Sequence, residues 1–292
     1  MSRILLTGAT GFLGANLLKR LVTEHDVAIL SREVSSFSRI SDLSSQIKNY
    51  RIESNSIDSI VESFRPEVII HCATDYGRKA VPPMQIVEAN LILPLKLIHA
   101  AGQFGVKKFI NTDTFLDKGV SHYSLSKRQF LEWFKTYADR MVCVNMVLEH
   151  FYGPYDDKTK FVSFVINELL CGRERIPLTL GTQKRNFIFI EDVVEAFMTV
   201  LDFPFGQDNG FKEFFIASEQ TITIRNLVEH LKHLCKNTNT LLDFGALPFR
   251  PNEIMDSSVD ISAIKALGWK PAVTLEEGLR YTVESELSDI KT

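Results

Sequence analysis

The sequence predicts an α/β fold, a doubly wound parallel sheet with a smaller, interleaved C-terminal domain. Short apolar runs recur along the first half of the chain, as at residues 3–6, 27–30 and 67–74. Amphipathic segments separate them at the spacing of βαβ units, which is typical of parallel sheets. A turn with three glycines, at residues 8–14, follows the first run and opens a helix. Such sheets open a crevice at the carboxyl ends of their strands, where we expect the functional residues.

The elements follow in a regular order. Leu13, Leu17 and Leu21 recur at helical spacing and predict the first helix. A polar, serine-rich stretch at residues 35–47 predicts a loop with a short helix. The other expected strands are residues 27–30, 51–53, 67–74, 108–111 and 178–180, and the other helices are residues 57–64, 84–104 and one that opens at Tyr123.

Each glycine of the first turn has a physical reason. Gly8 permits the tight turn, Gly11 lets the backbone approach a phosphate, and Gly14 lets the helix pack against the strand. The free amides and positive end of the helix would then bind a pyrophosphate. A purely structural turn is the alternative, but the position between a strand and a helix favours a Rossmann-type dinucleotide site. The expected contacts from this turn are Gly8, Thr10, Gly11, Phe12, Leu13 and Gly14.

The residues after the second strand indicate which cofactor binds. An acidic residue there accepts hydrogen bonds from the adenosine ribose, whereas an arginine pairs with a 2′-phosphate. Ser31 and Arg32 come first and Glu33 follows. We therefore expect NADPH, with NADH as the alternative if Glu33 faces the ribose. Asn55, beyond the third strand, is a candidate for a hydrogen bond to adenine.

A hydroxyl, a phenol and a lysine follow in the order that proton transfer requires. Thr112 lies at the carboxyl end of a predicted strand, and Tyr123 and Lys127 open the next helix. Residues four apart on a helix share one face, so the ammonium would lower the pKa of the phenol. A solvated helix face is the alternative, but the position inside a nucleotide-binding sheet favours catalysis.

Composition excludes several classes of partner. The chain has 292 residues, 45% of them hydrophobic, and a net charge of -3, without the basic patch of a nucleic-acid-binding protein. No segment has the length and apolar content of a membrane span. Four scattered cysteines predict free thiols in a reducing cytoplasm, with neither disulfides nor a metal site.

The motifs resemble those of the extended short-chain dehydrogenase/reductase family, which comprises epimerases, dehydratases and reductases of nucleotide sugars. The resemblance extends from the glycine turn, Thr112 and Tyr123-x-x-x-Lys127 through Phe151–Pro154, Gln183–Asp192 and Leu267–Pro271. Within the family the closest likeness is to the reductases of CDP-linked 4-keto-deoxy sugars. That likeness is carried by His71–Gly77, Asn111–Phe115, Leu148–Pro154 and Asn252–Met255.

The resemblance implies further site residues and a domain division. Cofactor contacts would include Ala73, Thr74, Asn90, Tyr123 and Lys127, and substrate contacts Asp75, Tyr76, Thr114, His150, Lys160, Phe161, Arg185 and Arg250. The dinucleotide-binding domain is expected at residues 1–149, joined by about 186–205, and the mainly substrate-binding domain at 150–292. The segment Leu267–Pro271 is expected to be a structural anchor.

Departures from the family pattern narrow the expected reaction. A dehydratase has an Asp–Glu pair directly after the threonine, whereas this chain has Asp113 and Thr114. His150 and Val147 stand where many relatives have an asparagine and an arginine, so the phosphate contacts must differ. The resemblance implies reduction of the 4-keto group of a nucleotide-linked 6-deoxy or 3,6-dideoxy hexose. The alternatives are an NAD-dependent 4-epimerase and a non-catalytic cofactor sensor.

We also expect a homodimer. Two helices resemble those that pair across a two-fold axis in the family, and each has an apolar stripe. The stripes comprise Leu91, Leu95, Leu97 and Ile98 on one helix and Phe130, Leu131 and Phe134 on the other.

Overall fold

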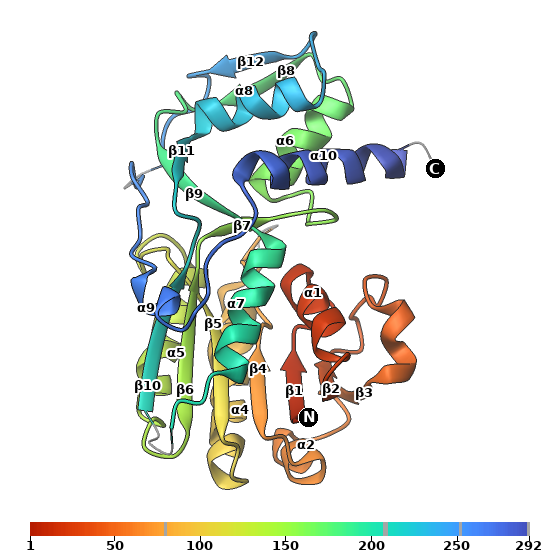
Figure 1. The fold of residues 1–292 in the computed structure, drawn as a ribbon, viewed down its shortest axis with the longest axis vertical. Helices are drawn as coiled ribbons and strands as arrows, with labels where there is room; N and C mark the ends of the chain where they lie inside the picture. The colour runs from red at the N-terminus through yellow and green to blue at the C-terminus, as the bar shows by residue number, and fades with distance from the viewer. Residues whose placement is uncertain (79–80, 207–209, 251–252, 291–292) are drawn as a thin grey trace. The chain divides into compact units, whose positions relative to one another are not determined.

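Seven strands form the central sheet, in the order β10-β6-β5-β4-β1-β2-β3 (Figure 1). The pairings that join β1 through β6 are all parallel. From β1 the chain builds outward through β2 and β3, and then returns to build β4, β5 and β6 on the other side. This reversal is the switch point of a Rossmann-type fold, so the fold class is confirmed. The strands are β1 (Arg3–Thr7), β2 (Asp26–Ser31), β3 (Lys48–Arg51), β4 (Val68–His71), β5 (Lys108–Thr114), β6 (Val142–Leu148) and β10 (Gly210–Ile216).

The computed structural model describes residues 1–78, 81–206, 210–250 and 253–290, so Asn252 of the motif quoted above lies outside it. The chain divides into two units. Unit 1 comprises Met1–Leu148 and Phe197–Phe214, and unit 2 comprises Glu149–Ala196 and Phe215–Thr292. The segment that returns to unit 1 therefore begins at Phe197, not near residue 186 as expected from the sequence.

Helices cover the sheet of unit 1 on both faces (Figure 1). They are α1 (Phe12–Leu21), the 3₁₀ helix η1 (Ser41–Gln46), α2 (Ile57–Phe64), α3 (Pro83–Val87), the π-helix η2 (Glu88–Ile92), α4 (Leu93–Gln103), α5 (His122–Lys135) and the C-terminal part of α7 (Ile190–Asp202). The core between the sheet and α2, α4 and α5 includes Phe109, Phe130 and Phe134, all fully buried. Phe109 meets Phe134 edge-on, with ring centroids 5.3 Å apart.

Three predicted elements differ in their bounds. The strand expected at residues 178–180 occupies Arg175–Leu178. The helix expected at residues 84–104 is interrupted by η2, where one extra residue is accommodated in the turn. The strand expected at residues 51–53 occupies Lys48–Arg51 instead. It ends there because the chain turns back: Ser54 N and the Asn55 side-chain amide both donate to the carbonyl of Arg51, at 3.3 and 3.1 Å.

Unit 2 contains two small sheets, one of three strands in the order β11-β9-β7 and one of two strands, β12 and β8. The strands are β7 (His150–Tyr152), β8 (Arg175–Leu178), β9 (Lys184–Phe189), β11 (Thr221–Thr223) and β12 (Leu241–Phe244). The helices are α6 (Phe161–Leu170), the N-terminal part of α7, α8 (Ile224–Leu234), α9 (Ser262–Lys265) and α10 (Leu275–Ile290). β9 pairs with β7 and β11, which is why residues 186–189 belong to unit 2.

Asp192 anchors the segment that follows α9. Its carboxylate accepts hydrogen bonds from the backbone amides of Ala272 and Val273, at 2.8 and 3.1 Å. Its carbonyl accepts a hydrogen bond from Nε1 of Trp269, at 3.0 Å. These contacts fix the chain just ahead of α10, so Leu267–Pro271 has the structural role expected for it.

Gly278 permits close packing of α10 against β7 and β9. A Cβ at this position would overlap the hydroxyl of Tyr152 and lie 2.9 Å from Cδ2 of Phe189. The hydroxyl of Tyr152 also donates to the carbonyl of Leu275, at 3.2 Å.

Within the described ranges, no helix combines the length and apolar character needed to cross a bilayer.

Candidate active site

The turn between β1 and α1 has the geometry that its glycines predict. Gly8 has a φ of +72°, and a Cβ there would lie 2.6 Å from the backbone N of Ala73. A Cβ at Gly14 would overlap the carbonyl of Gly8. Gly11 is exposed, and a Cβ there would meet only the oxygen of Gly8, at 3.3 Å. Two glycines thus permit the backbone contacts, and the third leaves the backbone open to a ligand.

The N-terminus of α1 fits a phosphate group. No side chain caps this end of the helix, and its first turn contains no acidic residue. The first backbone amides of the helix are therefore available to an anion, at the positive end of the helix dipole. Phe12 and Leu13 are buried, and Thr10 is half-buried beside the opening. These features fit the pyrophosphate of a dinucleotide.

Ser31 and Arg32 differ in exposure at the end of β2. The hydroxyl of Ser31 is buried and donates to Oδ1 of Asn49, at 2.7 Å. Arg32 and Glu33 are both exposed. Of the two residues expected to select the cofactor, Arg32 therefore has the accessible side chain. Asn55 is exposed as well.

Asn90 organises the loop that follows β4. Its side chain is fully buried in η2 and accepts hydrogen bonds from the Thr74 hydroxyl and the Asp75 amide, at 3.0 and 2.8 Å. Its amide group donates to the carbonyl of Asp75 and to the hydroxyl of Ser126, at 2.8 and 3.2 Å. The side chain of Asn90 thus joins the loop after β4 to α5. The hydroxyl of Thr74 is used in the same network.

Thr112 and Lys127 belong to a buried polar network at the carboxyl ends of the strands. Thr112 lies within β5, and its hydroxyl donates to the carbonyl of His71 at the end of β4, at 3.0 Å. The ammonium of Lys127 donates to the carbonyl of Thr112, at 2.8 Å. The imidazole of His71 is bonded in turn to the hydroxyl of Thr7, which also accepts from the Ala73 amide. The network therefore connects β1, β4, β5 and α5.

Tyr123 lies in the first turn of α5, whose start is fixed by a capping box between Ser121 and Ser124. Its ring centroid is 5.0 Å from that of Tyr76. Burial raises the pKa of Tyr123 well above its ordinary value, and a hydrogen bond from Thr114 opposes that effect. This differs from the expectation that Lys127 lowers the pKa of the phenol, because the ammonium is directed at the Thr112 carbonyl. A raised pKa keeps the phenol protonated at neutral pH.

Asp113 is held within the sheet. Its carboxylate accepts hydrogen bonds from the backbone amide of Thr114 and from the side chain of Asn145, at 2.7 and 3.0 Å. Asn145 also donates to Glu213 on β10, at 2.9 Å. The side chain of Asp113 is buried, and its charge raises the pKa of Lys127, which burial lowers. Asp113 thus acts on the lysine through its charge.

The candidate substrate residues of unit 2 already have partners within that unit. His150 is bonded through Nδ1 to the buried carboxylate of Glu149, at 2.9 Å. The ammonium of Lys160 lies 4.0 Å from the ring centroid of Phe151 and 3.3 Å from Oδ1 of Asp156. Phe161 is half-buried at the start of α6.

The two candidate arginines differ. Arg185 is buried, and its guanidinium bonds Glu253 and the carbonyls of Lys184 and Ile254. Arg250 is exposed. Arg185 thus forms an ion pair with Glu253 within unit 2, whereas the family resemblance implies that it contacts the substrate.

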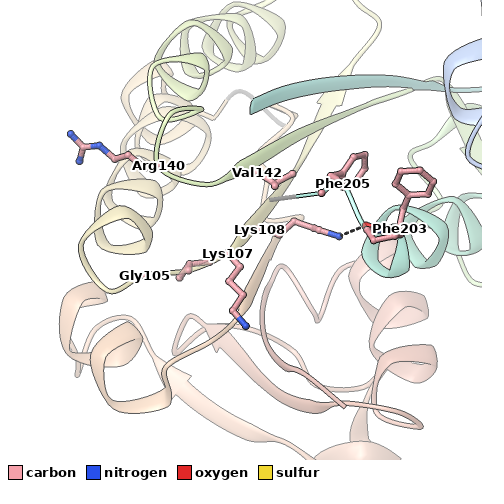
Figure 2. Close-up of a pocket in the computed structure, with 10 residues that line it drawn as sticks. Gly105, Lys107, Lys108, Arg140, Val142, Phe203 and Phe205 are labelled. Carbon is pink, nitrogen blue, oxygen red and sulfur yellow. Dashed lines mark hydrogen bonds between the residues drawn. The ribbon is translucent and has the colours of Figure 1, made fainter. Parts of the chain in front are cut away.

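A cavity of about 400 Å³ lies at the amino ends of β5 and β6 (Figure 2). The ammonium of Lys108 lies beside it and donates to the carbonyls of Val200, Leu201 and Phe203, at 2.9, 2.7 and 3.1 Å. Burial lowers the pKa of Lys108 to about 8. The lysine stabilises the C-terminus of α7, and because it begins β5, this cavity is not at the edge of the sheet where Thr112 lies.

Comparison with known proteins identifies the family. The model of the NAD-dependent epimerase/dehydratase family matches residues 4–211. The chain belongs to that family. It is therefore an enzyme that uses a nicotinamide cofactor, and the resemblance deduced from the motifs is confirmed.

Relatives and solved structures match over nearly the whole chain. CDP-abequose synthase of Salmonella muenchen is 32% identical over 95% of this chain and 96% of that relative. UDP-glucose 4-epimerase of Mycolicibacterium smegmatis is 27% identical over 97% of each chain. The structure of the Thermotoga maritima UDP-glucose 4-epimerase has a TM-score of 0.84 at 24% identity, covering 99% of each chain.

Proposed function

We propose that this enzyme reduces the 4-keto group of a CDP-linked 6-deoxy or 3,6-dideoxy hexose with NADPH, for the synthesis of deoxysugars of surface polysaccharides. The observation that carries the proposal is the position of Tyr123 in the first turn of α5, one turn ahead of Lys127, whose ammonium is bonded to the carbonyl of Thr112 on β5. The 32% identity to a CDP-abequose synthase supports the choice of nucleotide sugar.

NADPH, when bound, supplies the hydride. The protein supplies the proton and the geometry: the phenol of Tyr123 donates its proton to the sugar oxygen O4 as negative charge develops there. Lys127 binds the nicotinamide ribose with the N–H donors that its hydrogen bond to the Thr112 carbonyl leaves available. In this proposal Thr112 orients the keto oxygen of the substrate. The hydrogen bond from its hydroxyl to the carbonyl of His71 holds the threonine in place.

Dehydration and epimerisation are less well supported. A dehydratase needs two acidic groups that face the sugar, and here Thr114 replaces one while the other, Asp113, is bonded to Asn145. An epimerase must retain and recycle its NAD, whereas the exposed Arg32 suits a cofactor with a 2′-phosphate. A non-catalytic sensor has no need for Thr112, Tyr123 and Lys127 together.

The proposed ligand contacts are those that the family motifs imply. For the cofactor they are Gly8, Thr10, Gly11, Phe12, Leu13, Gly14, Ser31, Arg32, Asn55, Ala73, Thr74, Tyr123 and Lys127, with Asn90 acting through the loop. For the substrate they are Asp75, Tyr76, Thr114, His150, Lys160, Phe161, Arg185 and Arg250.

The decisive experiment is turnover with defined substrates. Purified protein should oxidise NADPH when given a CDP-linked 4-keto-deoxyhexose, and much more slowly when the same sugar is linked to UDP or dTDP. Protein that purifies with bound NAD and interconverts 4-hydroxy epimers without added cofactor would identify an epimerase instead. Binding of NADPH without turnover of any keto sugar would favour the sensor.

We further propose that the enzyme is a homodimer of the cytoplasm. The apolar residues Leu97, Ile98, Phe130, Leu131 and Phe134 are buried inside unit 1 and are not available to a partner. The exposed apolar residues of α5 are Leu125 and Trp133, which are 40% and 56% exposed. Eight positions apart, they lie on one side of the helix, where a second copy would cover them. All four cysteines are unpaired, as in a reducing compartment.

A further inference from the structure

Arg51 lies close to Arg32 at the end of β2, although the two arginines are far apart in the sequence. It is the last residue of β3 and is paired in register with Ser31, the last residue of β2. Its Nη1 donates to the backbone carbonyls of Arg32 and Glu33, at 2.8 and 3.1 Å. Because the two acceptors are backbone atoms of the turn itself, the guanidinium stays at the point where the second strand ends.

An aromatic ring further restricts this guanidinium. Cζ of Arg51 lies 5.5 Å from the ring centroid of Phe37, on the loop that follows β2. Both of its hydrogen bonds use Nη1, and a guanidinium has five N–H groups in one plane. The hydrogen bonds and the ring thus orient a planar donor group that suits phosphate oxygens.

Two arginines and two glutamates meet at the end of β2. Arg32 is exposed next to the guanidinium of Arg51. The carboxylate of Glu53 accepts hydrogen bonds from the backbone amide of Glu33, at 3.1 and 3.2 Å. Glu33 itself is exposed and carries the second negative charge. One of the two carboxylates is thus bonded to the backbone, and Arg32 and Arg51 supply the positive charge at the end of the strand.

We propose that Arg51, together with Arg32, binds the 2′-phosphate of the adenosine nucleotide. The proposal rests on the proposed use of NADPH and names the residue that distinguishes that cofactor. Arg32 offers a flexible charge from β2, whereas Arg51 offers an oriented donor from β3. An arginine oriented before binding loses less side-chain entropy when the phosphate arrives, and it therefore contributes more to affinity.

The test measures binding of two nucleotides that differ in one phosphate, adenosine 2′,5′-bisphosphate and adenosine 5′-monophosphate. Calorimetric titration of Arg51→Met should show binding of the bisphosphate weakened roughly ten- to a hundredfold, with the monophosphate changed less than about twofold. Arg51→Lys keeps the charge but not the fork, and should recover only part of the loss. Lys48→Met removes a cation from the other end of β3 and should leave both affinities unchanged.

Each other outcome has a defined meaning. Equal losses for the two nucleotides in Arg51→Met and Arg51→Lys would show that Arg51 only holds the turn, and would overturn the proposal. Unchanged affinity for the bisphosphate would overturn it as well. If Arg51→Met does not fold, Arg51→Lys decides by the same comparison. These titrations use no sugar, so a failure to reduce the keto sugar would refute the proposed reaction without affecting this result.

Discussion

The ammonium of Lys127 donates a hydrogen bond of 2.8 Å to the backbone carbonyl of Thr112. The side chain is 2% exposed, so the lysine is bound to the strand from inside the protein. Burial lowers the pKa of Lys127, and the negative charge of Asp113 raises it again in part. The position and the charge of the lysine are therefore both set by β5, through two consecutive residues.

Replacing Tyr123 by phenylalanine should abolish most turnover. The substitution removes the proton that the proposed reduction needs, and loss of a general acid costs about a hundredfold or more in rate. The ring remains beside Tyr76, so affinity for the cofactor should be nearly unchanged. Steady-state kinetics and NADPH titration measure the two effects. Tyr281→Phe removes a phenol hydroxyl from an exposed tyrosine of unit 2 and serves as the control, and wild-type turnover in Tyr123→Phe would refute the assignment.

Replacing Asp113 by asparagine should move the pH dependence of the reaction to lower pH. Reduction needs a charged Lys127 and a protonated Tyr123, so the rate falls as rising pH removes either proton. The charge of Asp113 raises both pKa values, so removing it lowers both and the alkaline decline begins earlier. The readout is kcat as a function of pH. Asp117→Asn makes the same charge change on an exposed loop and should leave the profile unchanged; a profile shifted upward in Asp113→Asn would contradict the assignment.

Replacing Arg32 by alanine should weaken NADPH and spare NADH. The guanidinium is exposed at the end of β2, and a hydrogen bond between charged groups contributes on the order of 1.5–3 kcal/mol. We expect NADPH to bind roughly ten- to a hundredfold less tightly and NADH to change little. Paired fluorescence titrations test this. Equal losses, or a wild type that prefers NADH, would mean that Glu33 faces the ribose.

The glycine turn and the strand order follow from local patterns, and the sequence was sufficient to predict them. Gly8 and Gly14 are required by atoms within the turn or just after β4, and the alternation of elements determines a parallel sheet. The contact between Arg51 and the backbone of Arg32 could not be predicted in this way. The proximity of Arg51 to Arg32 depends on the register between β2 and β3, and the eighteen residues between the two arginines give no local sign of that register.

The position of residues 184–189 illustrates the same limit. From the sequence, residues from about 186 onward are expected to belong to the dinucleotide-binding domain. The hydrogen-bonding partners of β9 are β7 and β11, however, and pairing over such separations is set by tertiary contacts. The raised pKa of Tyr123 could not be predicted either, because it comes mainly from burial, and burial depends on tertiary packing.

Replacing Gly278 by alanine should destabilise unit 2. The new methyl group would overlap the hydroxyl of Tyr152 and press on the ring of Phe189, and overpacking of this kind costs about 1–3 kcal/mol. Thermal or urea unfolding measures the change. Tyr152→Phe removes the overlapping oxygen, so the double variant should lose less than the sum of the two single variants. Additive losses would show that the hydroxyl is not the obstacle.

Replacing Trp133 by glutamate should separate the proposed dimer. The indole is 56% exposed on α5, and a carboxylate in its place would be buried without a partner at an interface. Light scattering at micromolar concentration should show a dimer for the wild type and a monomer for the variant. Leu247→Glu, at an exposed apolar residue of unit 2, is the control. A monomeric wild type would refute the dimer.

The chain crosses between its two units three times, at residues 148–149, 196–197 and 214–215. No cut of the gene therefore yields the nucleotide-binding half as one continuous fragment. A fragment ending at Leu148 would lack β10, and β6, whose seven residues are all buried, would become the border of the sheet. An uncovered apolar border strand recruits other chains, so such a fragment should precipitate rather than fold. Production of the half-molecule therefore requires residues 197–214 in addition to residues 1–148.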